Sequence, residues 1–148
     1  MKIWVDADSC PTVIREILFK AANRTGVKLT LVANQPIAIP KSPLIKFIQV
    51  SMGFDQADNE IVRRVEFGDL VITSDIPLAA EVIEKSATVI SARGELYTTE
   101  NIRNRLQTRD MMESLRASGV ETSGQSVFNQ ADRKTFAGKL DLILNRNT

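Results

Sequence analysis

The chain has 148 residues, of which 43% are hydrophobic and 25% charged, a composition typical of one globular domain with a buried core. Its formal net charge of +1 gives no electrostatic reason to favour nucleic acid over another partner. The sequence has no histidine and a single cysteine, Cys10, so an internal disulfide, a histidine base and a histidine- or cysteine-rich metal site are all excluded. Polar chemistry must use carboxylates, Lys, Arg, Ser, Thr or a bound metal.

The first eight residues contain two acids, Asp6 and Asp8, and no long apolar run. No stretch of the sequence approaches the roughly 20 apolar residues of a membrane span. We therefore expect no signal peptide, no membrane partner and a cytoplasmic location.

Strands and helices alternate through the first two thirds of the sequence. Short apolar, β-rich runs predict strands at residues 2–6, 28–33, 47–50, 69–73 and 87–90. Apolar residues at helical spacing predict helices that begin near Pro11, Asp55 and Asp75. This alternation predicts an α/β fold with a doubly wound, mostly parallel five-stranded sheet and helices on both faces.

The remainder of the sequence is predicted to be helical, with no strand after Gly94. A helix over residues 98–115 and a second over 131–144 are expected, separated by a flexible loop at 118–130. The predicted inward residues are Ile102, Leu106, Met112 and Leu115 in the first helix, and Phe136, Leu140, Ile143 and Leu144 in the second. The expected organisation is one domain over 1–148, with a sheet core at 1–94 and a helical extension at 95–148.

Five aspartates follow the predicted strands: Asp6, Asp8, Asp55, Asp58 and Asp75. Ligands of open parallel sheets bind outside the carboxyl ends of the strands, so these side chains are expected to converge. Ligation by oxygen alone favours Mg²⁺ or Mn²⁺, which can polarise a phosphoryl oxygen and activate water. The sequence therefore predicts a metal site made of these aspartates.

Simpler roles remain open for several of these acids. Asp75 could equally be a helix cap, and a capping arrangement explains Asp55 with Asp58 somewhat better than ligation does. Asp6 ends an apolar strand without a local partner and is the strongest candidate. Asp69 precedes its strand and is predicted to be a turn residue at the opposite end of the sheet.

Three further polar residues follow strands and are candidates for substrate contact: Asn34, Ser74 and Arg93. Arg93 could hold a phosphate, whereas a solvated arginine is an equally good explanation. Asn34 and Ser74 could instead stabilise turns. The four arginines between residues 103 and 116 alternate with acids, which predicts an ordinary charged helix face.

Several strings resemble the bacterial YaiI/YqxD family. They are residues 3–11 (IWVDADSCP), 31–35 (LVANQ), 53–59 (GFDQADN), 68–79 (GDLVITSDIPLA) and 92–95 (ARGE), with shorter matches at 101–103, 109–110, 115–119 and 132–133. That family is similar to PIN-like nuclease domains, which bind Mg²⁺ or Mn²⁺ through strand-end acids and cleave RNA or DNA. The resemblance implies a PIN-like domain in which Asp6 is the first-strand acid, Asp75 the acid after the fourth strand, and Asp55 or Asp58 the middle acid. Asp8 has no clear PIN counterpart.

The hypothesis that follows is a metal-dependent nuclease with Asp6, Asp8, Asp58 and Asp75 as catalytic residues and Asp55 as a further metal ligand. One alternative is a haloacid-dehalogenase-like phosphatase, because Asp6-Ala7-Asp8 is the pattern of an aspartyl nucleophile with an acid/base. Asp69 and Asp75 are similar to that family's later acidic motif, but they flank a strand and should lie at its two ends. A second alternative is a non-catalytic module that binds nucleic acid or protein.

Overall fold

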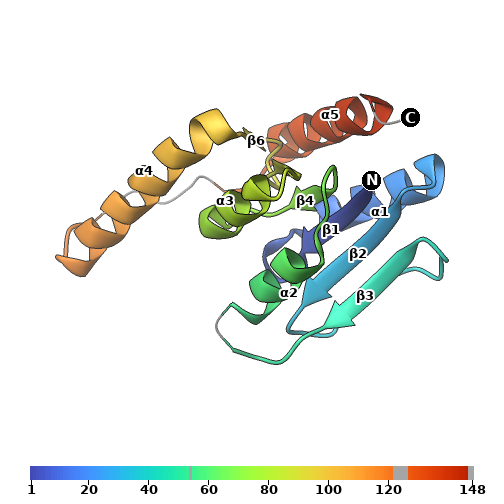
Figure 1. Ribbon diagram of the computed structural model, residues 1–148, viewed down its shortest axis with the longest axis horizontal. Helices are drawn as coiled ribbons and strands as arrows, with labels where there is room; N and C mark the ends of the chain where they lie inside the picture. Colours follow the sequence, from blue (N-terminus) through green and yellow to red (C-terminus); the bar gives the residue numbers. More distant parts are fainter. Residues whose placement is uncertain (54, 122–126, 147–148) are drawn as a thin grey trace.

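The computed structural model describes residues 1–53, 55–121 and 127–146. Its centre is a six-stranded sheet with the order β3-β2-β1-β4-β5-β6 (Figure 1). The strands are β1 (Lys2–Asp6), β2 (Lys28–Ala33), β3 (Ile45–Gln49), β4 (Leu70–Ile72), β5 (Thr88–Ile90) and β6 (Leu96–Tyr97). The helices are the 3₁₀ helix η1 (Ala7–Ser9), α1 (Thr12–Thr25), α2 (Gln56–Arg64), α3 (Ile76–Glu84), α4 (Thr99–Ala117) and α5 (Gln130–Arg146).

The sheet is mostly parallel, as predicted, but it has six strands where the sequence predicted five. β1 to β5 pair in parallel, whereas β6 runs antiparallel to β5 through the pairs Val89–Tyr97 and Ile90–Leu96. The prediction that no strand follows Gly94 is therefore wrong. A turn at residues 91–94 returns the chain beside β5, and two paired residues are too short to produce an alternating pattern in the sequence.

Helices cover both faces of the sheet, which confirms the doubly wound arrangement (Figure 1). On one face, α1 and α5 pack over Ile3, Val5 and Leu31. On the other face, α2 and α3 pack over Trp4, Val32 and Val71. Alternate residues of β1 thus enter opposite cores, and this explains why its three central residues are all apolar.

Asp69 lies at the amino-terminal edge of the sheet, opposite the edge where Asp6 lies, as the sequence predicted. Its carboxylate is buried and accepts hydrogen bonds from the backbone N–H of Lys2 at 3.0 Å, the Trp4 indole N–H at 3.0 Å and the backbone N–H of Glu66 at 2.9 Å. These donors satisfy the buried charge and connect the start of β1 to the turn before β4.

The last helix, α5, packs as predicted, with Phe136, Leu140, Ile143 and Leu144 buried in the core over α1. Its close approach to the turn before β6 depends on Gly94, which has a φ of 85°. A Cβ atom at this position would lie 2.7 Å from the backbone carbonyl carbon of Thr135. Glycine therefore permits both the turn and the packing of α5.

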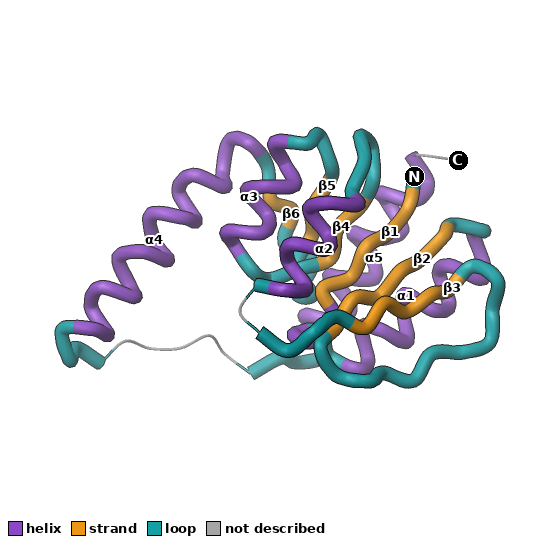
Figure 2. The backbone as a smooth tube through the Cα atoms, turned by 60° about the horizontal axis from the view of Figure 1, so that its bottom comes forward, coloured by secondary structure: helices purple, strands orange, loops and turns teal. Residues whose placement is uncertain are grey.

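Helix α4 leaves the body of the molecule, which overturns part of the predicted packing. The sequence placed Leu106, Met112 and Leu115 inward, but Ile102 is the only residue of α4 that is buried, and those three are only half-buried. α4 contacts α3 and then extends beyond the sheet (Figures 1 and 2). Periodicity indicated a helix with an apolar side, but not how far a neighbour would cover it.

The predicted loop at 118–130 lies partly outside the described residues, since 122–126 are not described. Within the described ranges, every helix is too short or too polar to cross a lipid bilayer.

Candidate functional site

A pocket of about 190 Å³ opens at the carboxyl edge of the sheet, where β1, β2 and β4 end. Its lining combines aspartates with a few small or neutral residues: Asp6, Asp8, Asn34, Gly53, Asp55, Gln56, Ala57, Asp58 and Asp75. The pocket thus brings together all five aspartates that the sequence singled out, together with Asn34.

Asp6 forms the floor of this pocket at the end of β1 and is 7% exposed. Its Oδ2 accepts hydrogen bonds from the hydroxyl groups of Thr73 at 3.0 Å and Ser9 at 3.2 Å. Burial raises the pKa of Asp6, the two hydroxyl donors lower it, and the charges of Asp75 and Asp8 raise it further. The carboxylate is therefore fixed in position while its charge is only partly compensated.

Thr73 is a site residue that the sequence reasoning missed. It is 2% exposed at the end of β4, and besides donating to Asp6 its Oγ1 accepts a hydrogen bond from the backbone N–H of Asp75 at 3.0 Å. One hydroxyl thus joins the strand-end acid of β1 to the segment that begins α3. The sequence signal that could have indicated Thr73 was a hydroxyl residue at the end of a predicted buried strand, two positions before Asp75.

Asp8 and Asn34 form the wall on the side of β2. Asp8 Oδ2 accepts a hydrogen bond from the backbone N–H of Asn34 at 2.8 Å, which connects η1 to the end of β2. The side-chain Oδ1 of Asn34 is buried and has no hydrogen-bond partner among the described residues. A buried carbonyl oxygen without a donor is uncommon in proteins and is a free oxygen ligand beside the pocket.

Asp55 occupies the N-cap position of α2 without capping it. Its backbone is left-handed, with a φ of 61°, and its side chain makes no capping hydrogen bond. A capping side chain normally needs an extended backbone, so the capping interpretation of Asp55 is wrong. Its carboxylate is exposed at the pocket rim instead.

Asp75 caps α3 and also lines the pocket. Its Oδ1 accepts a hydrogen bond from the backbone N–H of Leu78 at 3.0 Å, so the predicted cap is present. The same side chain interacts with Asp58, which belongs to the first turn of α2. The alternatives of cap and pocket residue are therefore not exclusive at Asp75.

Asp58 has the most perturbed acidity in the pocket. Burial, the charges of Asp75 and Asp6, the hydrogen bond with Asp75 and the charge of Asp55 together raise its pKa to about 7. Burial combined with crowded carboxylates that no cation compensates produces such a shift. Among the described residues, no lysine or arginine forms an ion pair with any of the five pocket aspartates.

The donor atoms suit a hard divalent cation, because every polar side chain of the pocket offers carboxylate or amide oxygens. The unpartnered Oδ1 of Asn34 adds a neutral oxygen to this set. As the side chains stand, however, no three carboxylate or thiol groups of the described residues surround a common point closely enough to hold one ion. The residues fit such a cation in chemistry, and their rotamers would have to change to coordinate it.

Ser74 and Arg93, the other two predicted substrate contacts, lie outside the pocket lining. Ser74 is exposed between β4 and α3. The guanidinium Nη1 of Arg93 is 2.9 Å from Asp132 Oδ2, in the first turn of α5. The structure therefore connects Arg93 to the start of α5, and its contact with a phosphate stays a prediction.

The fold and the site together define a doubly wound α/β domain with an aspartate-lined pocket at the carboxyl edge of its sheet. The chain belongs to the YaiI/YqxD family, whose model, described as "Uncharacterized BCR, YaiI/YqxD family", matches residues 4–146.

Relatives of nearly the same length are named as UPF0178 proteins. The chain is 67% identical over 144 residues to one from Thioalkalivibrio sulfidiphilus, covering 97% of this chain and 98% of the relative. It is 64% identical over 146 residues to one from Halorhodospira halophila, covering 99% and 97%. It is 62% identical over 147 residues to one from Syntrophotalea carbinolica, covering 99% of each. No solved structure matches the chain.

Proposed function

We propose that the protein is a divalent-metal-dependent phosphodiesterase that cleaves RNA or DNA. The observation that carries the proposal is the pocket at the carboxyl edge, where five aspartates converge and none of the described lining residues is cationic. Burial and the charges of neighbouring carboxylates raise the pKa of Asp58 and of Asp6, so keeping these groups ionised is an energetic cost to the fold. A bound Mg²⁺ or Mn²⁺ would offset that cost.

The ion would be held by Asp6, Asp8, Asp55, Asp58 and Asp75. When bound, it supplies charge stabilisation to a phosphoryl oxygen and lowers the pKa of a water molecule. Asp55 makes no side-chain cap and is exposed, so its rotamer can change to close the site. Thr73 and Ser9 keep Asp6 oriented through their hydroxyl groups.

Substrate contacts would extend around the pocket. Asn34 forms part of the wall and would contact the scissile nucleotide, while Ser74 and Arg93 would contact neighbouring phosphates. Arg93 would exchange its ion pair with Asp132 for a phosphate, which is feasible because both side chains are partly exposed.

The phosphatase alternative has less support. Asp69, which it would need near Asp75, is hydrogen-bonded at the amino edge of the sheet, with β4 between the two residues. Among the described residues, the pocket lining also contains no lysine to balance a phosphoryl-aspartate. We therefore make no phosphatase proposal.

The first test is Mn²⁺ titration calorimetry on the wild type and on Asp6→Asn/Asp75→Asn. Asp110→Asn/Asp141→Asn is a matched control, because it removes two exposed carboxylates outside the pocket. We expect binding by the wild type and the control, and about 100-fold weaker binding by the pocket variant.

The second test is cleavage of RNA and DNA oligonucleotides with Mg²⁺ or Mn²⁺. Asp6→Asn should abolish cleavage while circular dichroism shows an unchanged fold. Wild-type activity in that variant would remove Asp6 from the mechanism. The proposal would be overturned if the wild type binds no Mn²⁺ in either the titration or the cleavage buffer and cuts neither RNA nor DNA. If the protein binds nucleic acid and chelation of the metal leaves that affinity unchanged, it is a binding module instead.

A further inference from the structure

The aspartate pocket poses an electrostatic problem for the proposed substrate. A nucleic acid is a polyanion, and the described residues that line the pocket include five carboxylates and no lysine or arginine. Even with a metal ion bound, contacts that hold the phosphate backbone must therefore come from another part of the molecule.

Helix α4 has the position that such contacts require. It runs away from the body in the direction in which the parallel strands point, and so extends past the carboxyl edge of the sheet (Figures 1 and 2). Of its 19 residues only Ile102 is buried, so most of the helix contributes nothing to the core. A long helix whose residues are mostly exposed needs a reason other than packing.

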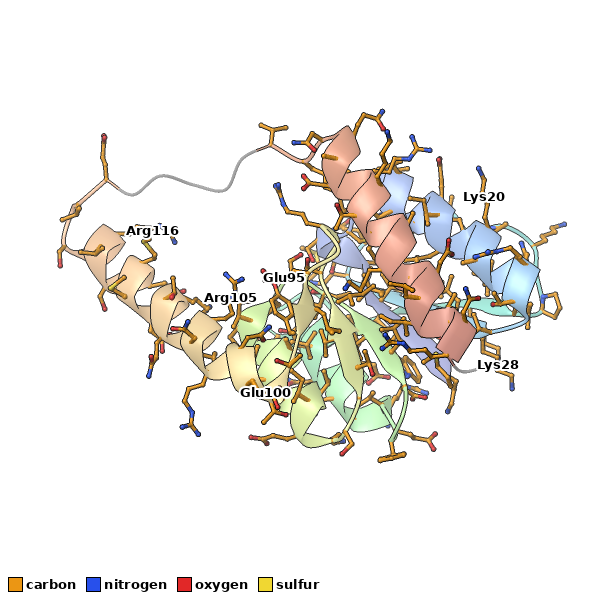
Figure 3. The ribbon with its side chains drawn as sticks, turned by 90° about the horizontal axis from the view of Figure 1, so that it is seen from above. Lys20, Lys28, Glu95, Glu100, Arg105 and Arg116 are labelled. Atoms are coloured by element: carbon orange, nitrogen blue, oxygen red, sulfur yellow. The ribbon has the colours of Figure 1, made fainter. Side chains whose placement is uncertain are left out.

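Three arginines of α4 form a stripe that continues the packed side of the helix. Arg105, Arg109 and Arg116 follow Ile102 by 3, 7 and 14 positions. With 3.6 residues per turn, all three lie within about 60° of Ile102 around the helix axis. Figure 3 shows Arg105 and Arg116 on the same side of α4. Since Ile102 packs against the domain, this arginine stripe lies on the side of α4 that continues from that contact.

The partners of these arginines can be exchanged for phosphate. Arg105 pairs with Glu95, and Arg109 pairs with Asp110 and Glu113 at 3.3 and 3.0 Å. These are exposed ion pairs, which contribute little to stability and are readily replaced in water. Arg105 and Arg116 are separated by about 16 Å along the helix axis. Because this separation is several-fold larger than the spacing of neighbouring phosphates, the stripe can contact several phosphates of one strand.

We infer that the arginine stripe of α4, made of Arg105, Arg109 and Arg116, binds the phosphate backbone of the nucleic-acid strand whose phosphodiester enters the aspartate pocket. The inference takes nucleic acid as the substrate class from the proposed function. It adds the surface that supplies affinity for the strand. It replaces the interpretation of these arginines as an ordinary solvated face.

The test measures binding apart from hydrolysis. Fluorescence anisotropy with labelled single-stranded RNA and DNA is recorded in EDTA, so that no metal-dependent cleavage occurs. The variant is Arg105→Gln/Arg109→Gln/Arg116→Gln, and the control is Arg24→Gln/Arg63→Gln/Arg64→Gln. The control removes the same charge from the last turns of α1 and α2, at the opposite edge of the sheet.

We expect the stripe variant to bind at least about tenfold more weakly, while the control stays within about twofold of the wild type. The slope of log affinity against log salt should become shallower by about 2 in the stripe variant alone, since each lost phosphate contact contributes about 0.7 for a single strand. The RNA and DNA arms identify which polymer the stripe prefers.

Equal losses in the variant and the control, or no loss in either, would overturn the inference, as would a wild type that binds neither oligonucleotide. A wild-type dimer in analytical ultracentrifugation that dissociates in the stripe variant would assign α4 to self-association and also overturn it. The proposed function fails separately, because a wild type that binds through the stripe and never cleaves refutes only hydrolysis.

Discussion

The hydroxyl of Thr73 lies 3.0 Å from the Oδ2 atom of Asp6 and donates a hydrogen bond to it, joining the ends of the adjacent parallel strands β1 and β4. The same oxygen accepts the backbone N–H of Asp75 at 3.0 Å. A neutral residue thus sets the relative positions of two pocket acids, which gives it a measurable role in both stability and ion binding.

Replacing Thr73 by Val should weaken both properties. The substitution keeps the side-chain shape but leaves a buried carboxylate and a backbone N–H each without one partner, so we expect the free energy of unfolding to fall by about 2 kcal/mol. Mn²⁺ affinity should fall about 10- to 100-fold because Asp6 loses its orientation. Urea denaturation and calorimetry measure the two effects. Thr108→Val, which removes an exposed hydroxyl from α4, is the control and should change neither.

Asp58 should make the metal-free protein less stable as the pH rises. Its pKa is about 7 in the fold and about 3.9 in an unfolded chain, so between these values the folded state holds a proton that the unfolded state has released. Stability should therefore fall from pH 4 to pH 7 and stay low above it. Asp58→Asn should remove this loss of stability. At pH 8 its free energy of unfolding should exceed that of the wild type by about 1–2 kcal/mol, once solvent screening of this half-buried group is allowed for.

Denaturant titrations in EDTA at a series of pH values measure this difference for Asp58. Adding Mn²⁺ at pH 8 should reverse the order, because the ion stabilises only a protein that binds it. A wild-type stability that is flat from pH 4 to pH 8 would contradict the prediction.

The backbone at Asp55 should oppose stability while its carboxylate supports ion binding. A left-handed φ of 61° is unfavourable for a residue with a Cβ atom. Asp55→Gly should therefore raise the free energy of unfolding by about 0.5–1 kcal/mol and lower Mn²⁺ affinity. Asp55→Asn tolerates the same backbone and should lower affinity with little gain in stability. Thermal unfolding and calorimetry on the two variants distinguish the effect of the backbone conformation from the effect of the charge. Unchanged Mn²⁺ affinity in both variants would exclude Asp55 as a ligand.

Two glycines with similar backbones should respond differently to alanine. At Gly94 a Cβ atom would meet backbone atoms of Thr135 and Phe136 at 2.7 and 2.8 Å, whereas at Gly26 nothing lies within 4 Å. Gly26→Ala should cost about 1 kcal/mol for its left-handed backbone alone. Gly94→Ala should cost about 2–4 kcal/mol, because α5 must also move away. Equal losses in chemical denaturation would show that the contact with α5 is unimportant.

The parts of the fold that the sequence predicted correctly are those in which local pattern and burial agree. β1 and β4 are buried on both faces, so the centre of β1 and all of β4 are continuously apolar, which is typical of a parallel sheet. β6 was missed because two residues carry no periodic signal. Leu106, Met112 and Leu115 were predicted to lie inward and are only half-buried, because burial needs a neighbouring element and α4 extends beyond α3.

The candidate site was visible in the sequence for a different reason. Acids that follow strands of a parallel sheet reach one edge whatever their separation along the chain, so Asp6, Asp58 and Asp75 could be grouped without knowing distances. The role of Thr73 and the left-handed backbone of Asp55 could not be predicted from the sequence, because both depend on which groups meet across strands and turns. The supporting hydrogen bonds of a site are set by tertiary contacts that sequence spacing does not encode.

The sheet order leaves β3 as a five-residue strand at one border, with β2 as its only partner among the described residues. Its free backbone N–H and C=O groups are a template on which another extended chain could polymerise. Lys46 is exposed on this strand, and three prolines precede it between residues 34 and 46. Charge and proline both discourage strand addition, so this border should disfavour edge-to-edge aggregation in concentrated samples.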